Sequence, residues 1–260
     1  MAYPAQLNAV EGEQFNNYDA QRWPLGTRMA MQDGRRFVFA AAGGTALVAG
    51  KLQQSEIPDV DHDTLAVQAA GVAGDRTITF TNGADEVEAD LYADGFVCIE
   101  AAAGVGEGRS YKIEITHGVL AASSTQILPL AAGYGLATAL NTSDKITLIK
   151  NPYQDNIITA APLTAMVTGI AQSAVPLDNW GWLQTWGPCA CLVDGVEVIG
   201  GRVSAAGTAG NSTVGSIEAT GIIITTTAPT TAQMTEALEL GYCMEVAPTT
   251  GFGMIFLKIS

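Results

Sequence analysis

The sequence predicts a mainly β protein, built from antiparallel sheets in β-sandwich or β-barrel-like domains, with an extended N-terminal arm. Glycine is frequent, at 29 of 260 residues, which favours many tight turns. Several segments alternate apolar and polar residues with the period of a strand. From Val203 to Thr235 the only ionisable residue is Glu218, so this β-branched tract is too weakly charged to stay solvated as coil. With 48% hydrophobic residues, the chain needs no disulfide or metal to form a core.

Residues 1–55 are expected to form an N-terminal arm and hairpin that attach the protein to a partner. The aromatic residues of its first part lie among Asn, Gln and Glu with no steady period of 2 or 3.6, as is typical of a segment that packs on another surface. Asp33-Gly34 then predicts a hairpin turn between two strands within residues 25–39. The segment before Glu56 holds four acidic and five basic residues, a slight positive balance that suits an acidic partner.

Residues 56–160 are expected to form an acidic antiparallel β-domain. From Glu56 to Glu107 there are twelve acidic residues and one basic residue, within a chain of net charge −14. Such a surface repels phosphate backbones, so the sequence predicts no direct binding of nucleic acid. Asn82-Gly83 predicts a hairpin between strands at 76–81 and 87–91, and further strands are expected at 96–100, 111–116 and 145–150.

Residues 161–260 are expected to form a Gly- and Thr-rich β-domain that mediates oligomerisation. Asp194-Gly195 predicts another hairpin, 252–259 a final strand, and 231–240 a helix. Trp180, Trp182 and Trp186 would share one side of an unbroken strand. Since aromatic residues are enriched in subunit interfaces, we assign these three to the oligomer interface, with a sugar-binding platform as the alternative.

The acidic segment Asp59-Val-Asp-His-Asp63 has the carboxylate spacing of the first half of a calcium-binding EF-hand loop. The rest of that loop is absent, because Thr64 occupies the glycine position and Ala70 the position of the bidentate glutamate. The four cysteines lack the spacing of a zinc site and are expected to be small buried thiols. We therefore predict no metal site and no cofactor.

No catalytic residues are predicted either. Neither His62 nor His117 lies in the sequence context of a catalytic triad, and the glycines of 104–108 lack the lysine of a phosphate-binding loop. Carboxylates such as Asp85 and Glu86 leave open a hydrolase with acids paired across strands, since spacing says nothing about that geometry.

The sequence also predicts no association with membranes. No stretch reaches the ~20 apolar residues that span a bilayer, and the first residues lack the basic-then-apolar order of a signal peptide. The protein is expected to be made and used without secretion.

Both ends of the chain resemble the head decoration (cement) proteins of tailed bacteriophages. The resemblance is carried by Trp23-Pro-Leu-Gly-Thr27 with Asp33-Gly-Arg-Arg36, by Gly181-Trp-Leu-Gln-Thr-Trp-Gly187 with Val193-Asp-Gly195, and by Gly200-Gly-Arg-Val203 to Ala209-Gly-Asn211. The acidic middle has no counterpart in this resemblance.

The resemblance implies a β-rich structural protein of the virion, commonly a trimer, that binds the outer capsid surface and cross-links neighbouring capsomers. Its partner would be the major capsid protein, and it would be made in the host cytoplasm. It carries over no catalytic residue. We assign capsid contact to the arm residues Tyr3, Phe15, Tyr18, Arg22 and Trp23. A receptor- or glycan-binding fibre or spike protein of the virion is the alternative.

Overall fold

The computed structural model describes residues 6–100, 108–133, 135–195, 197–207, 213–220, 239–247 and 251–259. The described chain is mainly β, with several antiparallel sheets and two short 3-10 helices, and none of its sheets closes into a barrel. It divides into two compact units, one formed by residues 1–57 and 152–260 and the other by Pro58–Asn151. The predicted fold class is confirmed.

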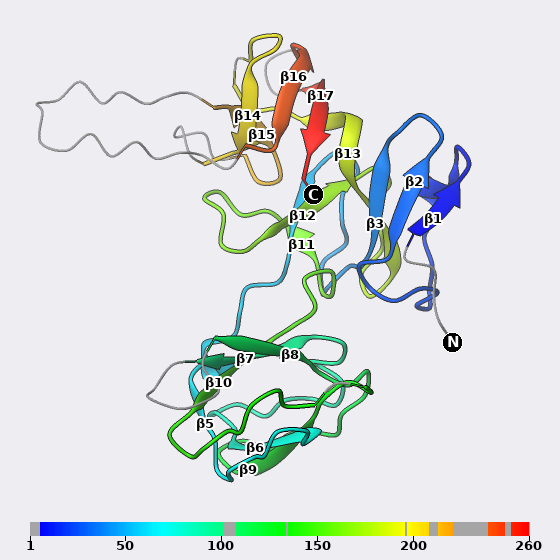
Figure 1. Cartoon of the computed structure of the whole chain (residues 1–260). Helices are drawn as coiled ribbons and strands as arrows, with labels where there is room; N and C mark the ends of the chain where they lie inside the picture. The colour runs from blue at the N-terminus through cyan, green and yellow to red at the C-terminus, as the bar shows by residue number, and fades with distance from the viewer. Residues whose placement is uncertain are drawn as a thin grey trace, which may run out of the picture. The chain divides into compact units, whose positions relative to one another are not determined.

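A branched sheet organises the first unit (Figure 1). Its main path runs β1 (Gln6–Ala9), β2 (Arg28–Met31), β3 (Arg36–Ala41), β13 (Trp180–Leu192), β17 (Phe252–Lys258), β16 (Gly241–Glu245), β14 (Arg202–Ala205) and β15 (Ile217–Ala219). A branch adds β12 (Val167–Ala171), β4 (Leu52–Gln54) and β11 (Ile157–Ile158). Neighbouring strands are antiparallel except β1 and β2, which are parallel.

Strand β3 is buried on both faces, which explains its continuous apolar sequence. Phe37 and Phe39 enter one hydrophobic cluster together with Trp182, whereas Val38 and Ala40 enter another together with Leu183. The hairpin predicted at Asp33-Gly34 is confirmed, since β2 pairs antiparallel with β3 around that turn.

Strand β13 changes partner along its length. Trp180–Gln184 and Trp186 pair with β3, with a register shift between Gln184 and Trp186, and Trp186–Leu192 pair with β17. This bulge breaks the alternation that would have placed three tryptophans on one side. Trp180 and Trp182 contribute to one cluster, but Trp186 packs edge-on against Phe256 instead, with ring centroids 5.6 Å apart. The strand is therefore not unbroken, and the condition for a single tryptophan face is not met.

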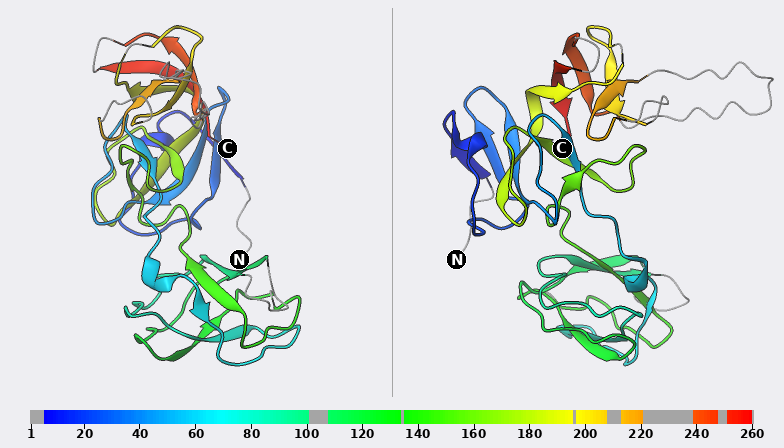
Figure 2. Two further views of the ribbon diagram at one scale, coloured as in Figure 1. Left: turned by 90° about the vertical axis from the view of Figure 1, so that its left-hand side faces the viewer. Right: turned by 180° about the vertical axis from the view of Figure 1, so that it is seen from behind.

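The second unit is a small sandwich. One layer is the sheet β5 (Leu65–Ala66), β10 (Lys145–Ile149), β7 (Phe96–Glu100) and β8 (Arg109–Lys112), and the other is the pair β6 (Thr77–Thr81) and β9 (Thr125–Pro129) (Figure 2). Residues of both layers, such as Ile78, Phe80, Val97 and Ile146, form one hydrophobic cluster. The alternating pattern of the sequence therefore does mark an antiparallel domain with a single core.

Two predicted hairpins are wrong. Strand β6 pairs with β9 and not with residues 87–91, although Asn82-Gly83 follows it directly. Asp194-Gly195 does not turn into a second strand either, since 197–201 contain none and Asp194 N–H donates to the carbonyl of Ile217 instead. The predicted helix at 231–240 and the β-branched run at 222–227 lie almost wholly outside the described residues.

The units also divide the chain differently from the three parts expected from the sequence. The acidic middle is compact between Pro58 and Asn151, whereas 56–160 was expected. The segments expected as an arm (1–55) and a C-terminal domain (161–260) share one unit, because β3 pairs with β13 over six residues. The N-terminal segment thus completes a sheet of its own chain.

Candidate functional site

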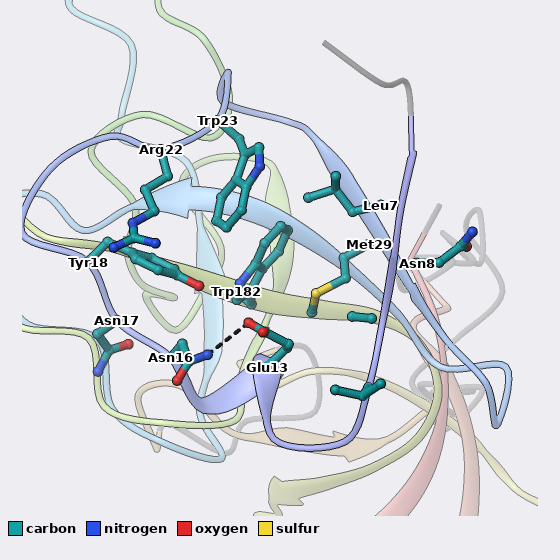
Figure 3. A pocket seen from close by; sticks show the side chains of 12 residues that line it. Leu7, Asn8, Glu13, Asn16, Asn17, Tyr18, Arg22, Trp23, Met29 and Trp182 are labelled. Carbon is teal, nitrogen blue, oxygen red and sulfur yellow. Dashed lines mark hydrogen bonds between the residues drawn. The ribbon is translucent and has the colours of Figure 1, made fainter.

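A pocket of about 600 Å³ lies where the N-terminal segment meets β13 (Figure 3). We call it the aromatic pocket. It is lined by Leu7, Asn8, Ala9, Val10, Glu13, Asn16, Asn17, Tyr18, Arg22, Trp23, Met29 and Trp182.

The wall of the aromatic pocket is shaped by a tight turn after β1. Gly12 adopts a left-handed conformation (φ 109°) and begins the 3-10 helix η1 (Glu13–Phe15). The Asn16 amide donates to the Glu13 carboxylate at 2.8 Å, which fixes the end of this turn. The chain then reaches Tyr18, whose backbone exchanges two 2.9 Å hydrogen bonds with Trp180. An ion pair between Glu11 and Arg35 ties the same segment to the β2–β3 hairpin.

Aromatic rings form the floor of the pocket. The centroid of Trp23 lies 5.3 Å from that of Tyr18, 5.2 Å from that of Phe39 and 5.3 Å from that of Trp182. The first two contacts are edge-to-face, the favoured arrangement of aromatic pairs. The Arg22 guanidinium lies 4.8 Å from the centre of the Tyr18 ring, a cation–π distance.

One buried hydrogen-bond donor in this pocket lacks a partner. Trp182 is 2% exposed, and its indole N–H has no hydrogen bond to any described residue. The indole nitrogen is itself closed to solvent, so the pocket is bounded by the face and edge of this ring and not by its N–H group. Polar side chains of Glu13, Asn16 and Arg22 lie beside the rings, whereas Asn8 points away from them. The pocket is thus suited to a group with an apolar or flat body and at least one acceptor.

The structure brings together residues that the sequence analysis assigned to two different surfaces. Tyr18, Arg22 and Trp23, expected to contact a capsid, line the pocket together with Trp182, expected at an oligomer interface. Trp180 is half-buried against the same cluster.

The remaining predicted site residues lie elsewhere. Phe15, on η1, is 51% exposed and does not line the pocket, and Trp186 lies beyond the bulge of β13. Tyr3 lies outside the described residues.

Sequence reasoning missed the wall from Leu7 to Val10 and the amides of Asn16 and Asn17. The only feature of the sequence that marks these residues is the concentration of Asn beside aromatic residues. Strands β1 and β2 pair in parallel, so no hairpin turn in the sequence reveals their contact.

The alternating carboxylates of Asp59–Asp63 have local structural roles. Asp59 accepts a hydrogen bond from the Asp61 N–H and caps the 3-10 helix η2 (Val60–His62). The Thr147 hydroxyl, 2.6 Å from Asp63, lowers the pKa of that carboxyl. Within the described residues, no group of three or more His, Cys, Asp and Glu side chains is placed to hold a metal ion. Asp85 and Glu86 are exposed in the loop after β6.

Comparison with protein families, with curated proteins and with solved structures finds no match for this chain. In the described part of the chain, no helix is long and apolar enough to cross a membrane.

Proposed function

We propose that this protein is a structural protein of a tailed-bacteriophage virion that binds the outer surface of the capsid and stabilises the head by cross-linking neighbouring capsomers. Its partner is the major capsid protein, and it acts as a homo-oligomer, a trimer in the family that it resembles. It works by binding and not by catalysis, without a cofactor and without contacting nucleic acid or membrane.

The observation that carries the proposal is the convergence of Tyr18, Arg22 and Trp23 on one pocket with Trp182. The first three lie in or beside the N-terminal motif of the resemblance, and Trp182 lies in the second motif. Two motifs far apart in the sequence therefore build a single surface feature.

Physical chemistry favours a protein partner for this pocket. Aromatic rings and an arginine are the residues most enriched at the energetic centres of protein interfaces, where an apolar group of the partner fills a pocket. The exposed Arg22 guanidinium beside the Tyr18 ring can donate to a carbonyl of the inserted segment. Many copies on one shell need only modest affinity each, because neighbouring attachments reinforce one another.

Co-sedimentation of the purified protein with virus heads tests the proposal. We expect Trp23→Ala to reduce binding at least about tenfold, since truncating a central aromatic anchor removes ~2 kcal/mol or more. Exposed Arg22→Ala, which keeps the aromatic cluster intact, should weaken binding by a smaller factor. Ile127→Ala, which truncates a side chain 61% exposed in the other unit, is the matched control and should bind as the wild type does.

Circular dichroism of each variant separates lost binding from lost folding. Heads that retain the folded Trp23→Ala protein as well as the wild type would refute the role of the pocket. Failure of the wild type to sediment with heads, or turnover in a broad glycosidase and esterase screen, would refute the proposed function.

A specific observation also favours the second candidate, a glycan-binding fibre or spike protein of the virion. An amide and a carboxylate that hydrogen-bond sugar hydroxyls, beside aromatic rings that stack on sugar faces, are typical of glycan sites, and Asn16, Glu13 and Trp23 supply them here. A glycan array read with wild type and Trp23→Ala distinguishes the two functions. Signal that disappears in the variant would support glycan binding, and a blank array would leave capsid attachment as the function of this pocket.

A further inference from the structure

A second pocket of the first unit, about 400 Å³ in volume, lies beside the bulge of β13. We call it the cationic pocket. Its walls are mainly apolar and its rim is charged; it is lined by Arg28, Arg36, Phe37, Val38, Tyr153, Ala165, Met166, Val167, Thr168, Thr185, Trp186, Glu239, Leu240, Lys258 and Ile259.

Positive charge dominates this rim. Its one carboxylate, Glu239, is neutralised by Arg202 at 3.4 Å and by Lys258 at 4.0 Å. Arg28 and Arg36 are exposed and form no ion pair within the described residues, and the Arg36 guanidinium lies 5.5 Å from the centre of the Trp186 ring. The whole chain has 12 basic and 26 acidic residues, so three basic side chains at one pocket are a marked concentration. Such a pocket selects a ligand with an apolar centre and flanking negative charges.

The second unit presents a segment with this chemistry. Val60 is 84% exposed, an unusual exposure for a branched apolar side chain, and it stands between Asp59 and Asp61. The segment is held rigidly: Asp59 caps η2, and buried His62 places its Nδ1 atom 2.7 Å from the Tyr92 hydroxyl and 3.3 Å from the Asp59 carboxylate. A preorganised segment loses little conformational entropy on binding.

We propose that the cationic pocket binds the Asp59-Val60-Asp61 segment of a second copy of this chain. Val60 enters the apolar part of the pocket, and the flanking carboxylates face Arg28 and Arg36. The contact joins different surfaces of the two copies, so it is heterologous and forms a ring if the rotation between copies closes.

Two arguments favour a second copy over other acidic ligands. A small inorganic anion would satisfy the arginines but leave the apolar surface of Trp186 and Met166 exposed to water. The Asp59-Val60-Asp61 segment, by contrast, offers both an exposed apolar side chain for these walls and two carboxylates for the arginines, and every second copy carries it. The inference does not depend on capsid binding, because it concerns the protein alone.

Sedimentation velocity of two complementary variants tests this contact. Arg28→Glu/Arg36→Glu alters the pocket and keeps the segment, whereas Val60→Lys/Asp61→Lys alters the segment, keeps the pocket and spares the Asp59 cap. We expect the wild type to self-associate and each variant alone to do so at least tenfold more weakly. An equimolar mixture of the two should form a 1:1 complex, because the intact segment of one fits the intact pocket of the other. Association should weaken between about 0.1 M and about 1 M salt, as the screening length falls from ~10 Å to ~3 Å.

Matched controls separate this contact from an effect of total charge. Arg76→Glu/Arg109→Glu makes the same charge change as the pocket variant at exposed residues elsewhere, and Val198→Lys/Glu245→Lys matches the segment variant at exposed residues of the first unit. Both controls should associate as the wild type does. A monomeric wild type, a mixture that fails to form a complex, or controls that lose association equally would each overturn the proposal. Head binding, measured separately, can fail without affecting this result.

Discussion

At the scale of single residues, Gly83 shows how a local sequence signal was misread. Asn82-Gly83 is the strongest short-range hairpin signal, yet here the glycine is needed for close packing. A Cβ atom at position 83 would lie 1.7 Å from the carbonyl oxygen of Asp61, far inside contact distance. The Asn82 amide donates to the carbonyls of Asp85 and Leu120, so the pair joins three loops of the second unit. No single-sequence pattern distinguishes this role from a turn.

Gly83→Ala should destabilise the protein by about 2 kcal/mol or more, because overpacking against backbone forces a shift of the η2 segment. Urea unfolding followed by circular dichroism measures this change. Gly118→Ala is the control, since an added Cβ there meets nothing within 4 Å and the backbone has no positive φ; its effect should stay within about 0.5 kcal/mol. Equal stability of the two variants would contradict the packing role of Gly83.

At the scale of elements, strand β13 shows what alternation predicts and what it does not. After the bulge its residues alternate strictly, with Cys189 and Cys191 buried in the core and Pro188 and Ala190 exposed. The sequence therefore predicts these two buried thiols, but it wrongly predicts the same for Cys98, which is only half-buried. It does not predict the bulge. At the bulge the Thr185 carbonyl accepts a hydrogen bond from the Ile259 N–H, and Trp186 lines the second pocket. Those contacts come from residues more than 70 positions away, which no local pattern reports.

The thiols of this core predict a pH dependence of stability. Burial raises the pKa of Cys189 to about 12 and also raises the pKa of Cys191 and Cys243. In the unfolded chain a thiol ionises near pH ~8.5, so above that pH the unfolded state releases protons that the folded state keeps. The free energy of unfolding should therefore fall as pH rises from about 8.5 towards 12, by at most ~1.4 kcal/mol per pH unit for each thiol.

Chemical unfolding in urea at several pH values between those limits measures the slope, and Cys189→Ala, which removes one of the thiols, should reduce it. Labelling the folded protein with a thiol reagent should modify half-buried Cys98 well before the three core cysteines. An unchanged slope in Cys189→Ala, or prompt labelling of all four cysteines, would contradict burial of these thiols.

At the scale of the whole molecule, composition located the acidic middle but not the way the remaining segments combine. The charge change near Glu56 lies within two residues of the boundary at Pro58. The association of residues 1–57 with 152–260 rests on pairing of β3 with β13 and of β4 with β11 and β12, all contacts between distant segments. The aromatic pocket depends on the same pairings. The sequence therefore suggests several of its residues but does not predict that they lie together.

The fragment 58–151 should fold by itself, because its hydrophobic cluster draws only on residues from Leu65 to Leu148. We expect a β-type circular dichroism spectrum and a single cooperative thermal transition for the isolated fragment. A matched variant, Phe80→Ala, truncates a fully buried ring of this core and should lower the midpoint of that transition strongly. A fragment without a cooperative transition would show that the second unit needs the rest of the chain.

The chain leaves the first unit just after β4 and returns just before β11, and these two strands pair antiparallel through Gln54 and Ile157. The exit and the re-entry are therefore held side by side by the sheet itself. Any foreign module whose two ends lie close together could be spliced in at this site in place of residues 58–151. The protein would then serve as a display scaffold, carrying an antigen or an enzyme as its cargo.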